Sequence, residues 1–511
     1  MHAALKHAPS DLISNEWVPL DAGGVESVNP ARPGDVVWSG TPVAGHVDRA
    51  VAAARSALPA WSSWSLDQRV GVLRRYQELA KERAGAIAEL ICDETGKALW
   101  DCKAEAGLLA GKVDITLATG ADTGLSRVSG YGFGMTETKD ASCWFRPHGV
   151  MAVVGPFNFP AHLPNGHIVP ALAMGNTVVF KPSDKTPAVG QALAELYQEA
   201  LESAGAPAGV FNLVQGAVET SKSLVAHTGA DGVLFTGSWP VGRAILEANL
   251  DHPGKMIALE MGGNNAAIVM GDADLHQAVT ECVRCAFITT GQRCTCTRRL
   301  IVHESVAEKV ISAVCKAASL LVVDDPRAET VFMGPIVSKE SRDAVFAFQD
   351  RLARGGGEVL VESTGVPGRE GWYLTPSVVR VPRFDIDTDD SGCDEEVFGP
   401  LLRISVVSSL DEAIGQANAT KYGLAASIFT KDAGSIDRFK REARAGCVNV
   451  NCGTAGASSK LPFGGLGWSG NHRPAGSFSL DYCAYPVAGM SESGDAAAVA
   501  PGMTVERGWV S

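Results

Sequence analysis

The sequence has no uninterrupted apolar run of the roughly 18 to 20 residues that a membrane-spanning helix needs. It also has no excess of basic residues, because 44 Lys and Arg stand against 57 Asp and Glu and give a net charge of −13. Proteins that bind nucleic acids or membrane surfaces in general carry a basic footprint, so the acidic balance argues against both classes. The first thirty residues have no long apolar core, and we therefore expect no secretory signal.

Cysteine does not form the dense framework of a disulfide-stapled protein. The 12 cysteines are scattered singly or in close pairs through 511 residues, which is typical of a reducing cytoplasm. A chain of this length has room for two or three domains, each with its own core. With 46% hydrophobic residues and 56 glycines that must serve many turns, the composition indicates a soluble, cytoplasmic α/β protein.

Short apolar runs alternate with helical patterns along two stretches of the chain. In the first stretch, strands are predicted at residues 150–154, 177–180, 210–214 and 232–235, and helices at 168–173 and 189–204. In the second, strands are predicted at 266–270, 299–303 and 401–407, and helices at 274–290, 305–321, 339–354 and 410–419. This alternation predicts parallel sheets covered on both faces, in a doubly wound nucleotide-binding architecture.

The other segments have less specific patterns. Residues 47–119 show helical periodicity without obvious chemistry, and residues 120–142 are rich in Gly, Ser and Thr and predict an extended arm. Residues 491–511 are small and polar, so we expect a loosely held tail.

Cys294 is a candidate nucleophile, because a thiol is intrinsically reactive even when only about a few per cent of it is ionised. One alternative is that Cys294 is an inert core cysteine. Another is that it is a zinc ligand, since four cysteines fall within 15 residues: Cys282, Cys285, Cys294 and Cys296. Cys282 and Cys285 lie inside a helical pattern without the turn of a zinc knuckle, and no metal site is expected. Glu260, upstream in a glycine-rich loop, is a carboxylate that could activate water.

Three further features suit a nucleotide. The turn from Gly237 to Gly242 follows a strand and opens a helix, whose free amides and dipole favour a phosphate. Its spacing matches neither the dinucleotide fingerprint nor a P-loop, so a plain strand-to-helix turn is the alternative. Lys181 ends a strand, at the edge where parallel sheets bind ligands, and a solvated lysine at a strand end is the alternative. Asp184 could accept a hydrogen bond from a ribose 2′-hydroxyl and would repel a 2′-phosphate, which favours NAD over NADP.

Seven motifs occur in an order that resembles the aldehyde dehydrogenase superfamily over nearly the whole chain. They are GPFNFP at 155–160, KPS at 181–183, FTGS at 235–238, LEMGG at 259–263, GQRC at 291–294, EEVFGP at 395–400 and PFGG at 462–465. A narrower resemblance, to the succinylglutamate semialdehyde dehydrogenase subgroup, rests on HLPNGHIVP at 162–170, QRCTCTRR at 292–299, SGNHRP at 469–474 and DYCA at 481–484. Many superfamily members carry lysine where this chain has Gly467, a departure that the subgroup shares.

The resemblance implies a role for each matching residue. Cys294 would attack the aldehyde, and the Asn158 side-chain amide with the Cys294 backbone N–H would hold the resulting oxyanion. Glu260 would then act as general base on the water that hydrolyses the thioester. The residues implied to bind the cofactor, NAD, are Lys181, Asp184, Gly237, Ser238, Gly242, Glu396 and Phe398.

The subgroup implies NAD-dependent oxidation of N-succinyl-L-glutamate 5-semialdehyde to N-succinyl-L-glutamate, in arginine catabolism. Because guanidinium groups bind carboxylates in bidentate geometry, Arg293 and Arg473 are the predicted substrate anchors. Other substrate-site candidates are Thr295, Phe463 and His167, with His472 as a helper and Cys296 as a tunnel-lining neighbour. The alternatives are an aldehyde dehydrogenase for another small carboxylated semialdehyde and a catalytically silent structural member of the fold.

The same resemblance implies a domain plan and partners. It predicts two doubly wound α/β domains with parallel-type sheets and a small β oligomerisation arm. The NAD-binding domain is expected at residues 1–123 and 145–258, the catalytic domain at 259–450, and the arm at 124–144 and 472–490. The expected partners are a small-molecule aldehyde and further copies of the chain, as a homodimer or homotetramer, with no nucleic acid and no membrane.

Overall fold

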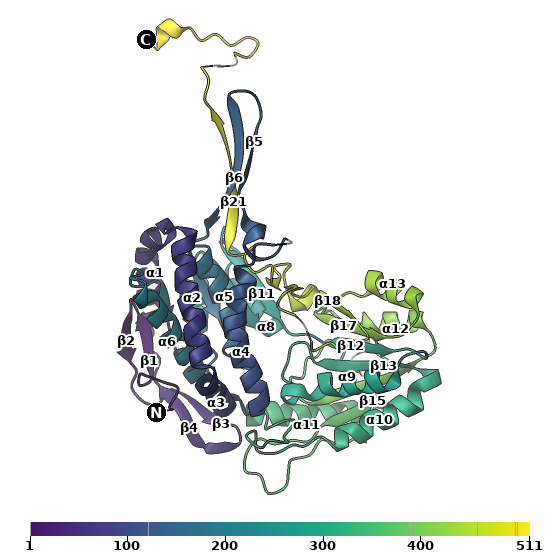
Figure 1. Ribbon diagram of the computed structural model, residues 1–511. Helices are drawn as coiled ribbons and strands as arrows, with labels where there is room; N and C mark the ends of the chain where they lie inside the picture. The colour runs from purple at the N-terminus through teal and green to yellow at the C-terminus, as the bar shows by residue number, and fades with distance from the viewer. Residues whose placement is uncertain are drawn as a thin grey trace.

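The computed structural model describes residues 2–120, 122–388, 391–456, 458–495, 497 and 499–510. Within these residues the chain builds two seven-stranded sheets, each packed against helices, and a three-stranded antiparallel sheet that projects from the body (Figure 1). The predicted α/β class, with two helix-covered sheets and a small β arm, is confirmed. None of the helices in the described part of the chain combines the length and apolarity that crossing a bilayer requires.

The first sheet has the strand order β11-β10-β7-β8-β9-β1-β2. The strands from β11 to β9 run parallel, whereas β1 pairs antiparallel with both β9 and β2. Every residue of β7 is buried, which explains its continuous apolar run. The strands are β1 (Ser10–Ile13), β2 (Glu16–Pro19), β7 (Val150–Val154), β8 (Thr177–Lys181), β9 (Phe211–Leu213), β10 (Gly232–Gly237) and β11 (Met256–Met261). The helices of this half are α1 (Gly45–Ser63), α2 (Leu66–Glu82), α3 (Ala84–Thr95), α4 (Leu99–Thr116), α5 (His162–Ala173), α6 (Pro187–Ser203), α7 (Val218–Ala226) and α8 (Trp239–Ala248).

The second sheet has the order β14-β15-β16-β13-β12-β17-β18, and only its edge strand β14 is antiparallel to its neighbour. The strands are β12 (Asn265–Val269), β13 (Thr297–His303), β14 (Glu358–Val361), β15 (Ser377–Arg380), β16 (Leu401–Val407), β17 (Ala425–Phe429) and β18 (Cys447–Val450). Its helices are α9 (Leu275–Phe287), α10 (Ala307–Ser319), α11 (Lys339–Arg354), α12 (Leu410–Ala417) and α13 (Ala433–Glu442). Two small hairpins complete the body, β3 (Val25–Asn29) with β4 (Arg32–Gly40) and β19 (Pro462–Phe463) with β20 (Ala475–Gly476).

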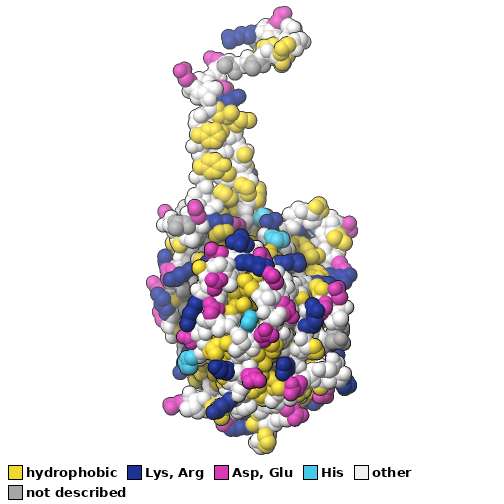
Figure 2. All heavy atoms as spheres, turned by 90° about the vertical axis from the view of Figure 1, so that its right-hand side faces the viewer, with side chains coloured by type: hydrophobic (Ala, Val, Ile, Leu, Met, Phe, Trp, Pro, Cys, Tyr) yellow, Lys and Arg dark blue, Asp and Glu magenta, His cyan; other side chains and the backbone are white. Residues whose placement is uncertain are grey.

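The arm brings together segments from the two ends of the chain. It contains β5 (Tyr131–Gly134), β6 (Lys139–Pro147) and β21 (Ala484–Glu492), and β21 pairs with the whole length of β6. Apolar side chains line the arm (Figure 2), and Tyr131 and Phe133 are 66% and 60% exposed. The chain after β21 continues outward, away from the body (Figure 1). Of the tail predicted at 491–511, Ala496, Ala498 and Ser511 lie outside the described residues.

Two local predictions are wrong. Helix α9 ends at Phe287 and not at residue 290, because Thr289 and Thr290 take left-handed φ angles of 58° and 55° and form a turn. Glu260 lies in strand β11 and not in a glycine-rich loop, since the glycines come after the strand. The chain therefore passes from the first sheet to the second between β11 and β12.

Candidate active site

A cavity of about 720 Å³ lies where the carboxyl ends of β7, β10 and β11 face the segment before β13. Its lining includes the three residues predicted for catalysis, Asn158, Glu260 and Cys294. Parallel strands bring their carboxyl ends to one edge of a sheet, which is why motifs far apart in the sequence meet here.

Cys294 follows a turn in which the three residues 289–291 all have φ angles between 55° and 70°. Burial raises the pKa of the Cys294 thiol well above its usual value, and the nearby carboxylates of Glu396 and Glu260 raise it further. The resting thiol is therefore protonated at neutral pH. It needs a polarised carbonyl or a base beside it to act as a nucleophile.

Glu260 lies near the end of β11, in register with Thr236 of β10, and its backbone is bridged to Gly470. Burial raises the pKa of its carboxyl well above the usual value, although a hydrogen bond from the Ala475 backbone opposes the shift. Its Oε2 atom has no hydrogen-bond partner among the residues that the structure describes. A buried carboxylate oxygen that is free toward a cavity is suited to take a proton from water.

Asn158 lies after β7 and is 5% exposed. Its Nδ2 atom donates a hydrogen bond to the Gln292 backbone carbonyl at 3.0 Å, and the backbone carbonyl of Asn158 accepts one from Lys97 Nζ at 3.2 Å. A side-chain amide has two N–H groups, so one is left to face an oxyanion. The contact with Gln292 ties this donor to the segment that carries Cys294.

The predicted phosphate turn lies at the start of α8. Gly237 and Ser238 line the cavity directly before this helix, where backbone amides are available to an anion. Gly242 is not in the lining but lets α8 approach β11, because a Cβ atom there would come 2.3 Å from Met261 Sδ.

Lys181 is the last residue of β8 and is 4% exposed. Burial lowers the pKa of Lys181 to about 8, and the neighbouring Asp184 carboxylate opposes that shift. Neither residue lines the cavity itself, but Ser183 between them does. The pair thus lies at the rim of the cavity, at the strand end where the sequence placed it.

Glu396 and Phe398 line the opposite wall. The Glu396 carboxylate lies 3.5 Å from Arg298, and a Cβ atom at Gly262 would come within 1.7 Å of Glu396 Oε2. The Phe398 ring meets Phe157 edge to face, with ring centroids 5.9 Å apart. These groups fit a nicotinamide dinucleotide. The buried lysine and the carboxylate beside Gly262 suit ribose hydroxyls, and the free amides at the start of α8 suit phosphates.

Four of the predicted substrate residues line the cavity: Arg293, Thr295, Phe463 and His167. The Arg293 guanidinium is already engaged, because its Nη2 atom donates to Asp101 at 2.7 Å and its Nε atom to Thr289 Oγ1 at 2.7 Å. Only part of its donor set is therefore left for a ligand.

His167 and Arg473 are placed differently. His167 lines the cavity, but its two ring nitrogens hydrogen-bond the Tyr482 hydroxyl at 2.9 Å and Thr236 Oγ1 at 3.0 Å. Burial lowers the pKa of His167 to about 3, so the ring is neutral and offers no charge to a carboxylate. Arg473 and His472 are exposed and are not among the lining residues.

Cys296 is not a lining residue, contrary to the expectation for it. It is fully buried in a small apolar cluster with Cys285 and Ile288. In the described part of the chain, no three His, Cys, Asp or Glu side chains are arranged to hold a metal ion.

The sequence interpretation missed several polar residues around the cavity. Lys112, His162 and Lys460 line it, and burial lowers the pKa of Lys112 to about 8. Lys460 could not be identified from the sequence around it, because only the path of its loop in the folded chain brings it to the cavity. Three further charged residues, Lys97, Asp101 and Glu105, are buried beside the cavity. They belong to residues 47–119, which showed no obvious chemistry in the sequence. The repeat of charged residues at every fourth position was the pattern that could have identified them.

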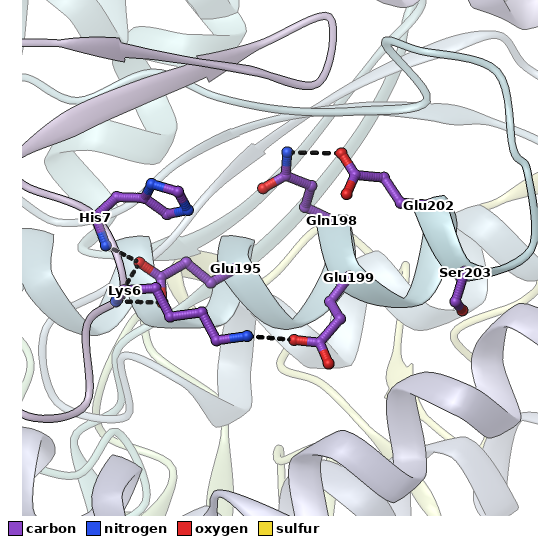
Figure 3. Close-up of a pocket in the computed structure, with 7 residues that line it drawn as sticks. All are labelled: Lys6, His7, Glu195, Gln198, Glu199, Glu202 and Ser203. Atoms are coloured by element: carbon purple, nitrogen blue, oxygen red, sulfur yellow. Dashed lines mark hydrogen bonds and ion pairs between the residues drawn. The ribbon is translucent and has the colours of Figure 1, made fainter.

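A separate shallow pocket lies where the N-terminal segment crosses α6 (Figure 3), lined by Lys6, His7, Glu195, Gln198, Glu199, Glu202 and Ser203. Its polar groups pair with one another: Lys6 Nζ donates to Glu199 at 2.6 Å, and the His7 backbone N–H donates to Glu195 at 3.1 Å. These contacts dock the N-terminal segment on the helix, and none of the predicted site residues lies here.

Comparison with known proteins agrees with this geometry. Residues 17–486 match the aldehyde dehydrogenase family. N-succinylglutamate 5-semialdehyde dehydrogenase 2 of Caulobacter vibrioides is 45% identical over 486 residues, which cover 94% of this chain and 96% of that protein. A betaine aldehyde dehydrogenase point mutant from Staphylococcus aureus, solved with NAD+, has a TM-score of 0.89 at 26% identity and covers 97% of this chain and 98% of its own.

The glyceraldehyde-3-phosphate dehydrogenase of Methanocaldococcus jannaschii, solved with NADP, has a TM-score of 0.85 at 27% identity and covers 93% of this chain and 100% of its own. The solved relatives thus bind either nicotinamide dinucleotide. Since the family match takes in nearly all of the two large sheets and every motif around the cavity, the chain belongs to the aldehyde dehydrogenase family and is an NAD(P)-dependent aldehyde dehydrogenase.

Proposed function

We propose that this enzyme oxidises N-succinyl-L-glutamate 5-semialdehyde to N-succinyl-L-glutamate with NAD, as a step of arginine catabolism. The observation that carries the proposal is the 45% identity, over nearly the full length, to a relative of that name. The cavity supports it, because the cations Arg293 and Lys460 line the same space as Cys294 and suit a substrate with two carboxylates. Another small carboxylated semialdehyde is the second candidate, since the same cations would bind it.

The residues around the cavity can perform the steps in order. The Cys294 thiol releases its proton to water as its sulfur attacks the aldehyde carbon, and the Asn158 amide and the Cys294 backbone N–H hold the oxyanion of the thiohemiacetal. NAD, when bound, supplies the hydride acceptor, and the substrate is left as a thioester on Cys294. Glu260 takes a proton from water as the water attacks this thioester, which releases the acid and restores the thiol.

The proposal predicts a clear order of preference in a panel of aldehydes. The dicarboxylic semialdehyde should give the highest kcat/KM, a monocarboxylic semialdehyde less, and a neutral aldehyde of equal length the least, because each carboxylate lost removes a charge-assisted contact with Lys460 or with the free donors of Arg293. NAD should be preferred to NADP, because Asp184 would repel a 2′-phosphate. Absorbance of the reduced cofactor measures both, and equal kcat/KM for neutral and dicarboxylic aldehydes would exclude the proposed substrate.

Two variants assign the anchors within this test. Lys460→Ala should lower kcat/KM for the dicarboxylic substrate about ten-fold and leave the neutral aldehyde unchanged, since one charge-assisted contact is lost. Arg473→Ala is the matched control, because this exposed arginine lies outside the cavity lining. If both variants kept the wild-type preference, Lys460 would not be an anchor.

The proposal extends to a homodimer or homotetramer formed through the arm. The arm projects from the body, and its exposed apolar side chains, such as Tyr131 and Phe133, would be covered by another copy of the chain. Light scattering of the purified protein should therefore give a mass of two or four chains, and a monomer at micromolar concentration would contradict this assembly.

A further inference from the structure

Three buried charged residues lie at the start of α4. Asp101 and Glu105 are one turn apart on this helix, Lys97 lies two residues before the helix begins, and each of the three is at most 2% exposed. Buried charges are costly unless they are paired and hydrogen-bonded. Their partners all lie in the two segments that carry the oxyanion donor and the nucleophile.

The first set of partners belongs to the segment around Asn158. Lys97 Nζ pairs with Glu105 at 2.6 Å and also donates to the Asn158 carbonyl at 3.2 Å. The other oxygen of Glu105 accepts hydrogen bonds from the backbone N–H groups of Ala161 and His162, at 3.0 and 3.1 Å. Lys97 and Glu105 thereby hold the turn that presents the Asn158 amide.

The second set of partners belongs to the turn before Cys294. Asp101 accepts from Thr289 Oγ1 at 2.6 Å and from Arg293 Nη2 at 2.7 Å, and Arg293 Nε donates to Thr289 Oγ1 at 2.7 Å. These three contacts form a closed triangle. Thr289 is β-branched and left-handed, a conformation that persists only where the surroundings hold it.

We propose that Asp101 is a positioning residue for catalysis, which fixes the turn at 289–293 and so sets the Cys294 thiol relative to the Asn158 amide. Helix α4 holds both halves of the site, because Asp101 and Glu105 lie one turn apart on it. The hydrogen bond from the Asn158 side chain to the Gln292 carbonyl also joins the two segments directly. Arg293 then serves first to lock the turn and only secondarily to meet substrate.

Asp101→Asn should lower kcat about 10²-fold, because small displacements of reacting groups cost about that much. KM for the cofactor and for a neutral aldehyde should change by less than about three-fold, since neither ligand depends on the charge of Arg293 and their uniform binding is untouched. Two variants of Thr289 provide a second measurement. Thr289→Ser keeps the hydroxyl, so its kcat should stay within about three-fold of the wild-type value. Thr289→Ala lacks the hydroxyl, so its kcat should fall as much as that of Asp101→Asn.

Val113→Ala is the matched control for a merely structural role. Val113 is fully buried on the same helix and packs in the apolar core, so this variant should lower the Tm and leave kcat at 25 °C within about two-fold. A folded Asp101→Asn enzyme with wild-type kcat, or a Thr289→Ser enzyme as slow as Thr289→Ala, would overturn the proposal. The inference rests on the proposed role of Cys294, and an active Cys294→Ala enzyme would refute that role separately.

Discussion

Replacing Cys294 by alanine is expected to lower kcat by about 10⁴-fold or more. The thioester route needs the sulfur as a covalent partner, and the other two catalytic groups cannot take its place. Asn158 only stabilises negative charge, and Glu260 only moves a proton. Formation of the reduced cofactor by the purified variant measures the loss.

The matched control is Cys296→Ala. Cys296 is two residues further along and fully buried, but it lies outside the cavity lining. This variant should retain aldehyde oxidation. If Cys294→Ala kept its activity with an unchanged Tm, the covalent mechanism would be wrong.

Replacing Glu260 by glutamine should separate the two halves of the reaction. Acylation of Cys294 needs no general base on water, so about one reduced cofactor per chain should form in a rapid burst. The steady-state rate should then fall about 10²- to 10⁴-fold, because hydrolysis of the thioester has lost its base. Stopped-flow absorbance measures both phases, and linear formation at the wild-type rate would remove Glu260 from the mechanism.

The pH dependence of the same step has a definite sign. Burial raises the pKa of Glu260, so its carboxyl stays protonated to a higher pH than an exposed glutamate does. The base form therefore accumulates as the pH rises, and wild-type hydrolysis should speed up across that range. Glu260→Gln should lack this rise.

The residues at strand ends were predictable from the sequence. Asn158, Lys181 and Gly237 were placed by motifs that directly follow or end apolar runs, and such runs become the parallel strands whose carboxyl ends share one edge. The antiparallel strands β1, β2 and β14 were not predicted, because four-residue strands carry too little pattern to be distinguished from loops.

The partners of the site residues could not be predicted, because they depend on packing between distant segments. Arg293 pairs with Asp101, 192 residues away, and nothing in the motif around Cys294 shows that helix α4 lies against it. Burial and the charge of Lys112 lower the pKa of His167 and keep its ring neutral, and both depend on segments that pack against α5. A motif thus identifies which groups react, whereas the fold decides which of them are free to bind substrate.

Mass spectrometry of the Glu260→Gln enzyme, mixed with NAD and N-succinylglutamate 5-semialdehyde, tests the covalent mechanism most directly. We expect one acyl group per chain, located on the peptide that contains Cys294 and formed together with the burst of reduced cofactor. An enzyme that forms reduced cofactor with Cys294 unmodified, or that carries the acyl group on Cys296, would contradict it.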